Sequence, residues 1–161
     1  HNEISLSSDA KRHLTKVFVL SVASYFENLI QKILIEYISN QCNNNDKVLN
    51  FVKKKAISFQ YHTYFSWGEK DEPEKPGKNA NTFFSLFGDG FKTDIIREIK
   101  SKPDLEKSVK SFLEIGHIRN ILVHSNFAAY NNIDKTIDEF HSMYKNSLVF
   151  IYFFEDYLKK H

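Results

Sequence analysis

The chain has 161 residues, of which 42% are hydrophobic and 26% charged, a composition typical of a soluble globular protein. Its formal net charge of +2 is far from the strongly basic balance of a dedicated nucleic-acid binder. Cys42 is the only cysteine, which excludes an internal disulfide and predicts a reducing, cytoplasmic setting. We expect one domain over residues 1–161, which could be excised from a longer protein.

The first expected element is a long helix that begins at the N-cap candidates Ser7, Ser8 and Asp9 and runs to about Ser39. Its apolar residues recur with helical spacing over an arc wide enough to need more than one partner helix. The longest uncharged apolar run, residues 17–26, is shorter than the roughly 20 residues that span a membrane. We therefore expect no membrane contact.

The middle of the chain predicts a shorter helix and then a loop. Asp46 is expected to cap a helix that holds apolar residues up to Phe59. Residues 61–81 break the periodicity with glycines, prolines and charges, and predict an exposed loop insertion, with a hairpin at residues 60–66 as an alternative. The three lysines at residues 53–55 form a basic cluster whose ordinary interpretation is a solvated helix face.

Three further helices complete the expected fold. A helix over residues 93–100 follows an apolar patch and stops before Pro103. The next helix, capped by Asp104, ends near Asn126, and the last one covers residues 133–159. Only five glycines and three prolines are present, which argues against a turn-rich β fold. The predicted class is therefore all-α, an antiparallel helical bundle of four to five helices with one loop insertion.

The helix that follows Asp104 carries the polar residues best suited to chemistry. At 100° per residue, Arg119 and His124 lie about 140° apart, whereas Asn120 and His124 are near neighbours. His117 lies two turns before His124 on nearly the same stripe. Burying this strip in the core would desolvate several polar groups and a permanent cation. We therefore expect it to face a wet groove or a pocket between subunits.

The segment IRNILVHSNF, residues 118–127, resembles the Arg-(four to six residues)-His motif of HEPN domains, with the frequent polar residue after the arginine at Asn120. The segment ASYFENLIQKIL, residues 23–34, is similar to the opening helix of the RiboL-PSP-like HEPN branch. This resemblance implies a HEPN-like homodimer in which two motifs meet across a cleft. It also implies a metal-independent endoribonuclease that acts as a toxin or as an effector of phage defence.

The residue types of the motif suit RNA cleavage. Histidine, with an ordinary pKa of about 6.5, can exchange a proton with the RNA 2′-OH or the leaving 5′ oxygen. Arginine can hold the scissile phosphate and stabilise its extra negative charge. We predict Arg119, His124 and Asn120 as catalytic residues. We predict His117 and Lys110 as substrate-binding residues, RNA as the substrate, and no metal or cofactor.

Alternatives to catalysis remain open on the sequence alone. Arg119 could pair with an acid such as Glu27, while His124 packs at a helix end. Glu114-x-x-His117 matches the spacing of di-iron bundles, but that site needs two further inward carboxylates. A HEPN-like bundle without activity would serve as an RNA-binding or dimerising module, which the weak net charge favours.

Regulation is a separate question. HEPN domains that are silenced by modification of a tyrosine carry that tyrosine two residues after the motif histidine. In this sequence the position is Asn126, and the nearest downstream tyrosine is Tyr130. This departure argues against regulation of that kind, and leaves an antitoxin or regulatory protein of another kind as a possible partner.

Overall fold

A computed structural model describes residues 2–68, 77–125, 127, 130 and 133–160, with side chains from Ser7 onward. Apart from one antiparallel bridge, between Ser66 and Asn79, all regular structure in these residues is helical, which confirms the all-α class. The elements are α1 (Asn2–Gln41), α2 (Asp46–Val52), the π-helix η1 (Lys53–Ile57), α3 (Tyr61–Tyr64), α4 (Asn81–Ser85), α5 (Asp89–Ser101), α6 (Pro103–His124) and α7 (Ile137–Lys160).

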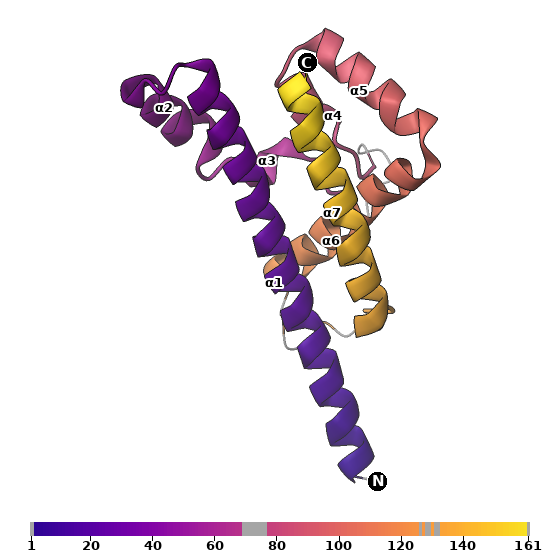
Figure 1. Ribbon diagram of the computed structural model, residues 1–161. Coiled ribbons are helices and arrows are strands. Elements are labelled where there is room, and N and C mark those ends of the chain that lie inside the picture. The colour runs from indigo at the N-terminus through magenta and orange to yellow at the C-terminus, as the bar shows by residue number, and fades with distance from the viewer. Residues whose placement is uncertain (1, 69–76, 126, 128–129, 131–132, 161) are drawn as a thin grey trace.

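The three long helices form the centre of the bundle. Figure 1 shows α1 and α7 running in the same direction, while α6 crosses them in the opposite sense, and each of the three contacts the other two. Phe112 of α6 joins them, because its ring centroid lies 5.5 Å from that of Phe26 in α1 and 5.2 Å from that of Phe150 in α7. All three rings are buried, so this aromatic contact lies in the core.

The first helix is longer than expected. It begins at Asn2, and Asp9 lies inside it, where its carboxylate pairs with Arg12 at 3.6 Å instead of capping the helix. By length and composition it could cross a membrane, since a window of α1 has a mean hydropathy of 1.3. That is weak evidence for a span, because a core helix passes the same test. Phe26 and Ile30 show that role, since both are buried in the bundle.

The aromatic part of the stretch predicted as an exposed loop lies in the core. Tyr61 and Tyr64 lie in α3 and are buried, as are Phe65 and Trp67. The hairpin alternative is wrong, because residues 61–64 are helical and Ser66 pairs with Asn79 instead, through two backbone hydrogen bonds of 2.9 Å. The aromatic side chains explain the difference, because burying them lowers the free energy more than leaving them exposed in a solvated loop. Residues 69–76 of the predicted loop lie outside the described residues.

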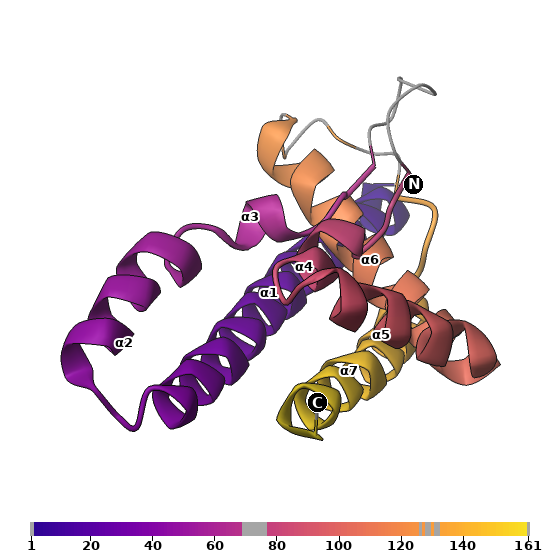
Figure 2. The same ribbon diagram turned by 90° about the horizontal axis from the view of Figure 1, so that it is seen from above.

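Helix starts also differ from the sequence prediction. Asn45, not Asp46, caps α2, and its Oδ1 accepts hydrogen bonds from the backbone N–H of Lys47 and Val48 at 3.1 and 3.2 Å. Within the described chain we find seven α-helices instead of four or five. The two that the sequence did not predict, α3 and α4, have five residues or fewer and are too short for periodicity to reveal. In Figure 2, α2 stands apart from α6 and α7.

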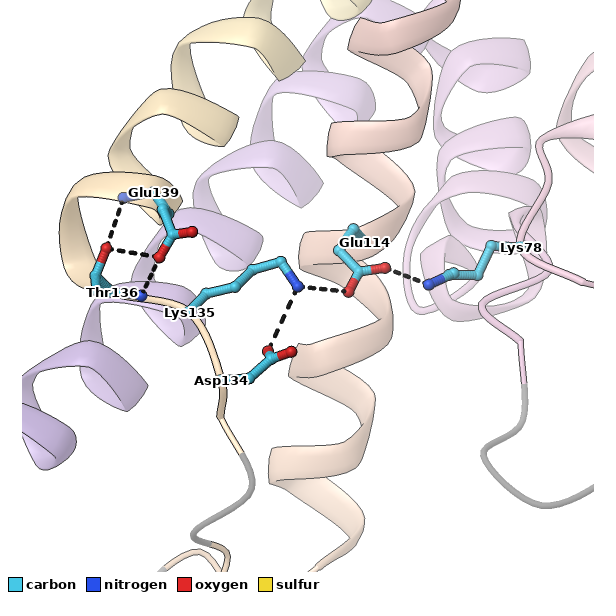
Figure 3. A network of polar contacts seen from close by, with 6 residues as sticks. All are labelled: Lys78, Glu114, Asp134, Lys135, Thr136 and Glu139. Atoms are coloured by element: carbon cyan, nitrogen blue, oxygen red, sulfur yellow. Dashed lines mark hydrogen bonds and ion pairs between the residues drawn. The ribbon is translucent and has the colours of Figure 1, made fainter.

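The last helix begins at Ile137, later than the expected Ile133, because a capping box fixes its start. The Glu139 carboxylate accepts hydrogen bonds from the backbone N–H and the hydroxyl of Thr136 at 2.7 and 2.8 Å, and the N–H of Glu139 donates back to the Thr136 hydroxyl at 3.3 Å (Figure 3). The preceding helix, α6, has Pro103 in its first turn in place of the predicted Asp104 cap.

Candidate functional site

The motif occupies the last two turns of α6. The guanidinium of Arg119 donates a hydrogen bond from Nη1 to Oδ1 of Asn120 at 3.1 Å, and both side chains are half-buried. His124 is the last residue of the helix and is exposed. Ser125 closes the helix by donating its backbone N–H to Ile121 at 2.8 Å. The predicted helix end, Asn126, lies outside the described residues.

Aromatic side chains from α3 and from the strand-like segment after it form the surroundings of the motif arginine. Tyr61, His62 and Trp67 line a small cavity together with Arg119 and Asn120. The indole Nε1 of Trp67 donates to the backbone carbonyl of His62 at 3.1 Å, which holds the indole ring in place. The segment predicted as a solvated loop therefore supplies one wall of the candidate site.

Two nearby charges act in opposite directions on the pKa of Tyr61. Burial raises the pKa of the Tyr61 hydroxyl, the nearby negative charge of Glu27 raises it further, and the positive charge of Arg119 partly opposes both. The phenol therefore keeps its proton at any physiological pH and remains a hydrogen-bond donor beside the arginine.

Glu27 does not neutralise the motif. Its carboxylate accepts a hydrogen bond from the amide of Gln31 at 3.2 Å, within α1. In the part of the chain that the structure describes, Arg119 forms no ion pair within 4.0 Å with Glu27 or any other acid. The geometry thus gives no support to the alternative in which Arg119 is a structural partner of Glu27. Its guanidinium keeps donors available for an anionic ligand.

The two predicted substrate-binding residues lie apart from this pocket. Lys110 is exposed and pairs with Glu106 at 2.8 Å, beside a groove of about 410 Å³ between α4, α5 and α6. His117 is half-buried, and its Nδ1 is buried without a hydrogen-bond partner among the described residues. The structure therefore brings together Arg119 and Asn120, but places Lys110 at a different groove.

Glu114, proposed above as a candidate metal ligand, belongs to an ion-pair network instead. Its carboxylate contacts Lys78 on one side and Lys135 at 3.5 Å on the other (Figure 3). Burial alone would raise the pKa of Glu114, but the hydrogen bond and charge of Lys78, with the charges of Lys135 and His117, lower it overall. Among the described residues, no three His, Cys, Asp or Glu side chains gather as metal ligands, so the di-iron alternative has no geometric support.

Lys16 of α1 holds the segment that follows His124. Its ammonium donates a hydrogen bond to the backbone carbonyl of Phe127 at 2.7 Å and lies 5.2 Å from the centroid of the Phe127 ring. Only 1% of Lys16 is exposed, so this lysine has given up water for those two contacts. It therefore fixes the chain three residues after the motif histidine to the first helix.

Sequence reasoning missed Tyr61, Trp67, Gly116 and Lys16. Only Gly116 left a readable signal, since an isolated glycine inside a helical pattern usually has a packing reason. A Cβ built at Gly116 would lie 1.9 Å from Cζ3 of Trp67, so the indole packs directly on the helix backbone one turn before Arg119. The other three residues come from distant parts of the chain and have no local pattern.

The comparison with known families identifies the family of the chain. The sequence model of the RiboL-PSP-HEPN family matches residues 1–160, nearly the whole chain. In the same comparisons, no curated protein and no solved structure matches this chain.

Proposed function

Because the chain belongs to the RiboL-PSP-HEPN family, for which a ribonuclease or RNA-binding function is expected, we propose that it is a metal-independent endoribonuclease. The observation that carries this proposal is the state of Arg119. Its guanidinium is half-buried, oriented by Asn120 at 3.1 Å, and free of ion pairs among the described residues. A fixed, unneutralised guanidinium suits a phosphodiester ligand.

In the proposed reaction, the substrate is single-stranded RNA. Its 2′-OH loses a proton and attacks the adjacent phosphorus, while the bond from phosphorus to the 5′ oxygen breaks and that oxygen gains a proton. His124 serves these proton transfers, and Arg119 stabilises the charge that develops on the phosphate oxygens. The products are a 2′,3′-cyclic phosphate and a free 5′-OH, so DNA is not a substrate.

A homodimer forms part of the same proposal. Arg119 and His124 lie about 140° apart around α6, so in one chain their side chains do not converge on a single phosphate. Two copies of the motif across a two-fold axis would bring an arginine and a histidine together. An exposed apolar side chain within the motif supports such an interface, since Val123 of α6 is 52% exposed.

We further propose that the enzyme acts in the cytoplasm as a toxin or an effector of phage defence, held in check by an antitoxin or another regulatory protein. A nuclease of this kind would harm its own cell without such a regulator. The single, half-buried thiol of Cys42 is compatible with a reducing compartment.

The test is incubation of the purified protein with single-stranded RNA in EDTA, beside Arg119→Ala and His124→Ala. We expect cleavage to cyclic phosphate ends by the unmodified protein. Each substitution should reduce the rate about 10²- to 10⁴-fold, the usual contribution of a general acid–base or of a charge-stabilising donor. The cleavage rate and the end groups are the measurements.

Arg97→Ala/His141→Ala is the matched control, because it removes the same residue types from exposed positions on α5 and α7. It should cleave at the unmodified rate. Intact RNA with a folded, dimeric protein would reject the nuclease and favour the non-catalytic RNA-binding module.

A further inference from the structure

Residues 46–60, which we call the arm, carry a higher net positive charge than the chain as a whole. The arm comprises α2, η1 and the three residues that lead to α3, and it contains four lysines and one aspartate, a formal charge of +3. Since the whole chain carries +2, the remaining residues sum to −1. The weak net charge of the protein therefore conceals a concentrated basic segment.

The lysines of the arm are unneutralised and both of its aromatic side chains are exposed. Lys47, Lys53, Lys54 and Lys55 are exposed, and none of them forms an ion pair within the described chain. Phe51 is 66% exposed and Phe59 86% exposed, and α2 buries no residue. Figure 2 shows why, because α2 projects from the bundle along the far side of α1. These side chains do not serve the core.

The backbone of α2 places one charge and one ring of the arm on the same side. Lys47 and Phe51 are four residues apart within α2, so they lie on one face of that helix. The second part of the arm is a π-helix, closed by the backbone N–H of Ser58 on the carbonyl of Lys53 at 2.7 Å. Such turns are rare and often occur at functional sites.

Phe59 adds a second unusual feature to the arm. Its φ of 65° is a costly backbone conformation for an aromatic residue, yet it leaves the ring in solvent. The hydroxyl of Tyr64 donates a hydrogen bond to the carbonyl of Ala56 and ties this part of the arm to α3. The exposed ring is therefore held out by a fixed backbone.

The arm leads directly to the candidate site. Two residues after Phe59 the chain reaches Tyr61, which lines the cavity of Arg119 and Asn120. The end of the arm at Phe59 is therefore joined directly, along the chain, to one wall of that cavity. Within the described chain, no other segment combines clustered lysines that lack ion pairs with exposed Phe side chains.

We propose that the arm binds the single-stranded RNA that the motif cleaves, an inference that rests on the proposed function for the identity of the ligand. The lysines of residues 53–55 contact phosphates, and unpaired bases stack on Phe51 and Phe59. Cations that follow the backbone, with aromatic rings for the bases, are the usual means of holding single strands without sequence preference. Charge complementarity selects RNA over a second copy of the chain, because two arms of +3 repel each other.

The test measures binding without cleavage. A fluorescent single-stranded oligonucleotide with 2′-O-methyl riboses lacks the nucleophile, and its anisotropy reports binding at several salt concentrations. We expect Lys53→Gln/Lys54→Gln/Lys55→Gln to bind at least about tenfold more weakly at low salt. The slope of log K against log salt should fall by about 2, as for the loss of three phosphate contacts on a single strand. Phe51→Ala/Phe59→Ala should weaken binding at least about fivefold with an unchanged slope.

The matched control for charge is Lys107→Gln/Lys145→Gln/Lys160→Gln, which removes three exposed lysines from α6 and α7. Tyr152→Ala is the matched control for the rings, since this tyrosine is 51% exposed on α7. Both controls should bind as the unmodified protein does. Equal affinities of arm variants and controls would overturn the proposal, as would an unmodified protein that does not bind the oligonucleotide. A change in oligomeric state alone would assign the arm to a second copy.

The outcome separates this inference from the nuclease. Arm-dependent binding by a protein that leaves ordinary RNA intact would support RNA binding by the arm and reject the nuclease activity. Cleavage and binding that are both unaffected by the arm variants would support the nuclease activity and reject RNA binding by the arm. Circular dichroism and the urea midpoint of each variant confirm that the protein remains folded.

Discussion

At the scale of single residues, Gly116 decides how closely α3 and its neighbours approach the motif helix. A glycine in the middle of a helix usually costs about 0.5–1 kcal/mol relative to alanine. Here the indole of Trp67 occupies the space that a side chain would need, because a Cβ at position 116 would lie 1.9 Å from Cζ3 of the indole. The residue that weakens α6 locally therefore allows a large ring to pack beside Arg119.

We predict that Gly116→Ala destabilises the protein by about 1–3 kcal/mol, although alanine is the better helix former, because Trp67 must move. The free energy of urea unfolding is the measurement. Gly90→Ala is the control, since nothing lies within 4 Å of a Cβ at that position in α5. A Gly116→Ala protein at least as stable as the unmodified one would contradict this account of the contact.

Residues differ in how far the sequence reveals them. Arg119, Asn120 and His124 could be placed by helical spacing, and the structure has all three on α6. Lys16 and Tyr61 could not be found in that way, because contacts between distant segments leave no periodic signal in either one. Lys16 was further hidden by its charge, since lysines are almost never fully buried without a partner.

At the scale of elements, Glu114 connects α6 to segments on both of its sides. Lys78 comes from the chain that leads to α4, and Lys135 comes just before α7 (Figure 3). Both lysines lie near the start of a helix, so the carboxylate links α6 to the points where two other helices begin. The motif helix is thereby held about one and a half turns before Arg119.

We predict that Glu114→Gln lowers the free energy of unfolding at pH 7 by about 1–3 kcal/mol, because two charged hydrogen-bonding contacts are weakened. The pKa of Glu114 is lowered in the folded state, so its stabilising effect is present above the unfolded value of 4.5. The effect is lost as the pH falls through the lower, folded pKa. Urea titrations at pH 7 and in acid measure the difference between the two proteins.

Glu106→Gln provides the comparison for Glu114. Its carboxylate pairs with Lys110 one turn away in the same helix, at 2.8 Å and in solvent, so it connects no second element. Its removal should matter less at pH 7. A difference between the unmodified protein and Glu114→Gln that persists unchanged in acid would show that the carboxylate charge is not responsible.

Helices likewise differ in whether their sequence predicts them, because some have periodic apolar residues and others depend on contacts with distant segments. The long helices α1, α6 and α7 were predictable, since each repeats its apolar residues over many turns. The short helix α3 was not, because four residues carry no period and its aromatic side chains are buried by partners elsewhere. The start of α7 was readable, since Thr136-x-x-Glu139 is a capping-box pattern, but its significance was missed.

At the scale of the whole molecule, the proposed dimer makes a prediction about mixtures. If Arg119 of one copy acts with His124 of the other, an Arg119→Ala chain and a His124→Ala chain form a heterodimer with one intact pair. Mixing the two inactive variants should then restore cleavage up to about a quarter of the unmodified rate, since half of the dimers are mixed and each has one site.

The cleavage rate of the refolded mixture is the measurement, with exchange of subunits followed by differently labelled chains. A mixture of Arg119→Ala with Arg119→Ala/His124→Ala serves as the control, because no combination of these chains contains Arg119. Exchange without any recovery would place both residues of one site on the same chain.

The π-helix in the arm has a consequence for its length. A π-helix is geometrically an α-helix with one inserted residue, here within Lys53–Ile57. Deleting one of its lysines would restore the α-helical register and rotate all that follows by about 100° relative to α2. Substitution and deletion would remove the same charge, but only deletion would turn Phe59 to another side. The number of residues in the arm thus sets the orientation of Phe59, whereas the lysine side chains set the charge of the arm.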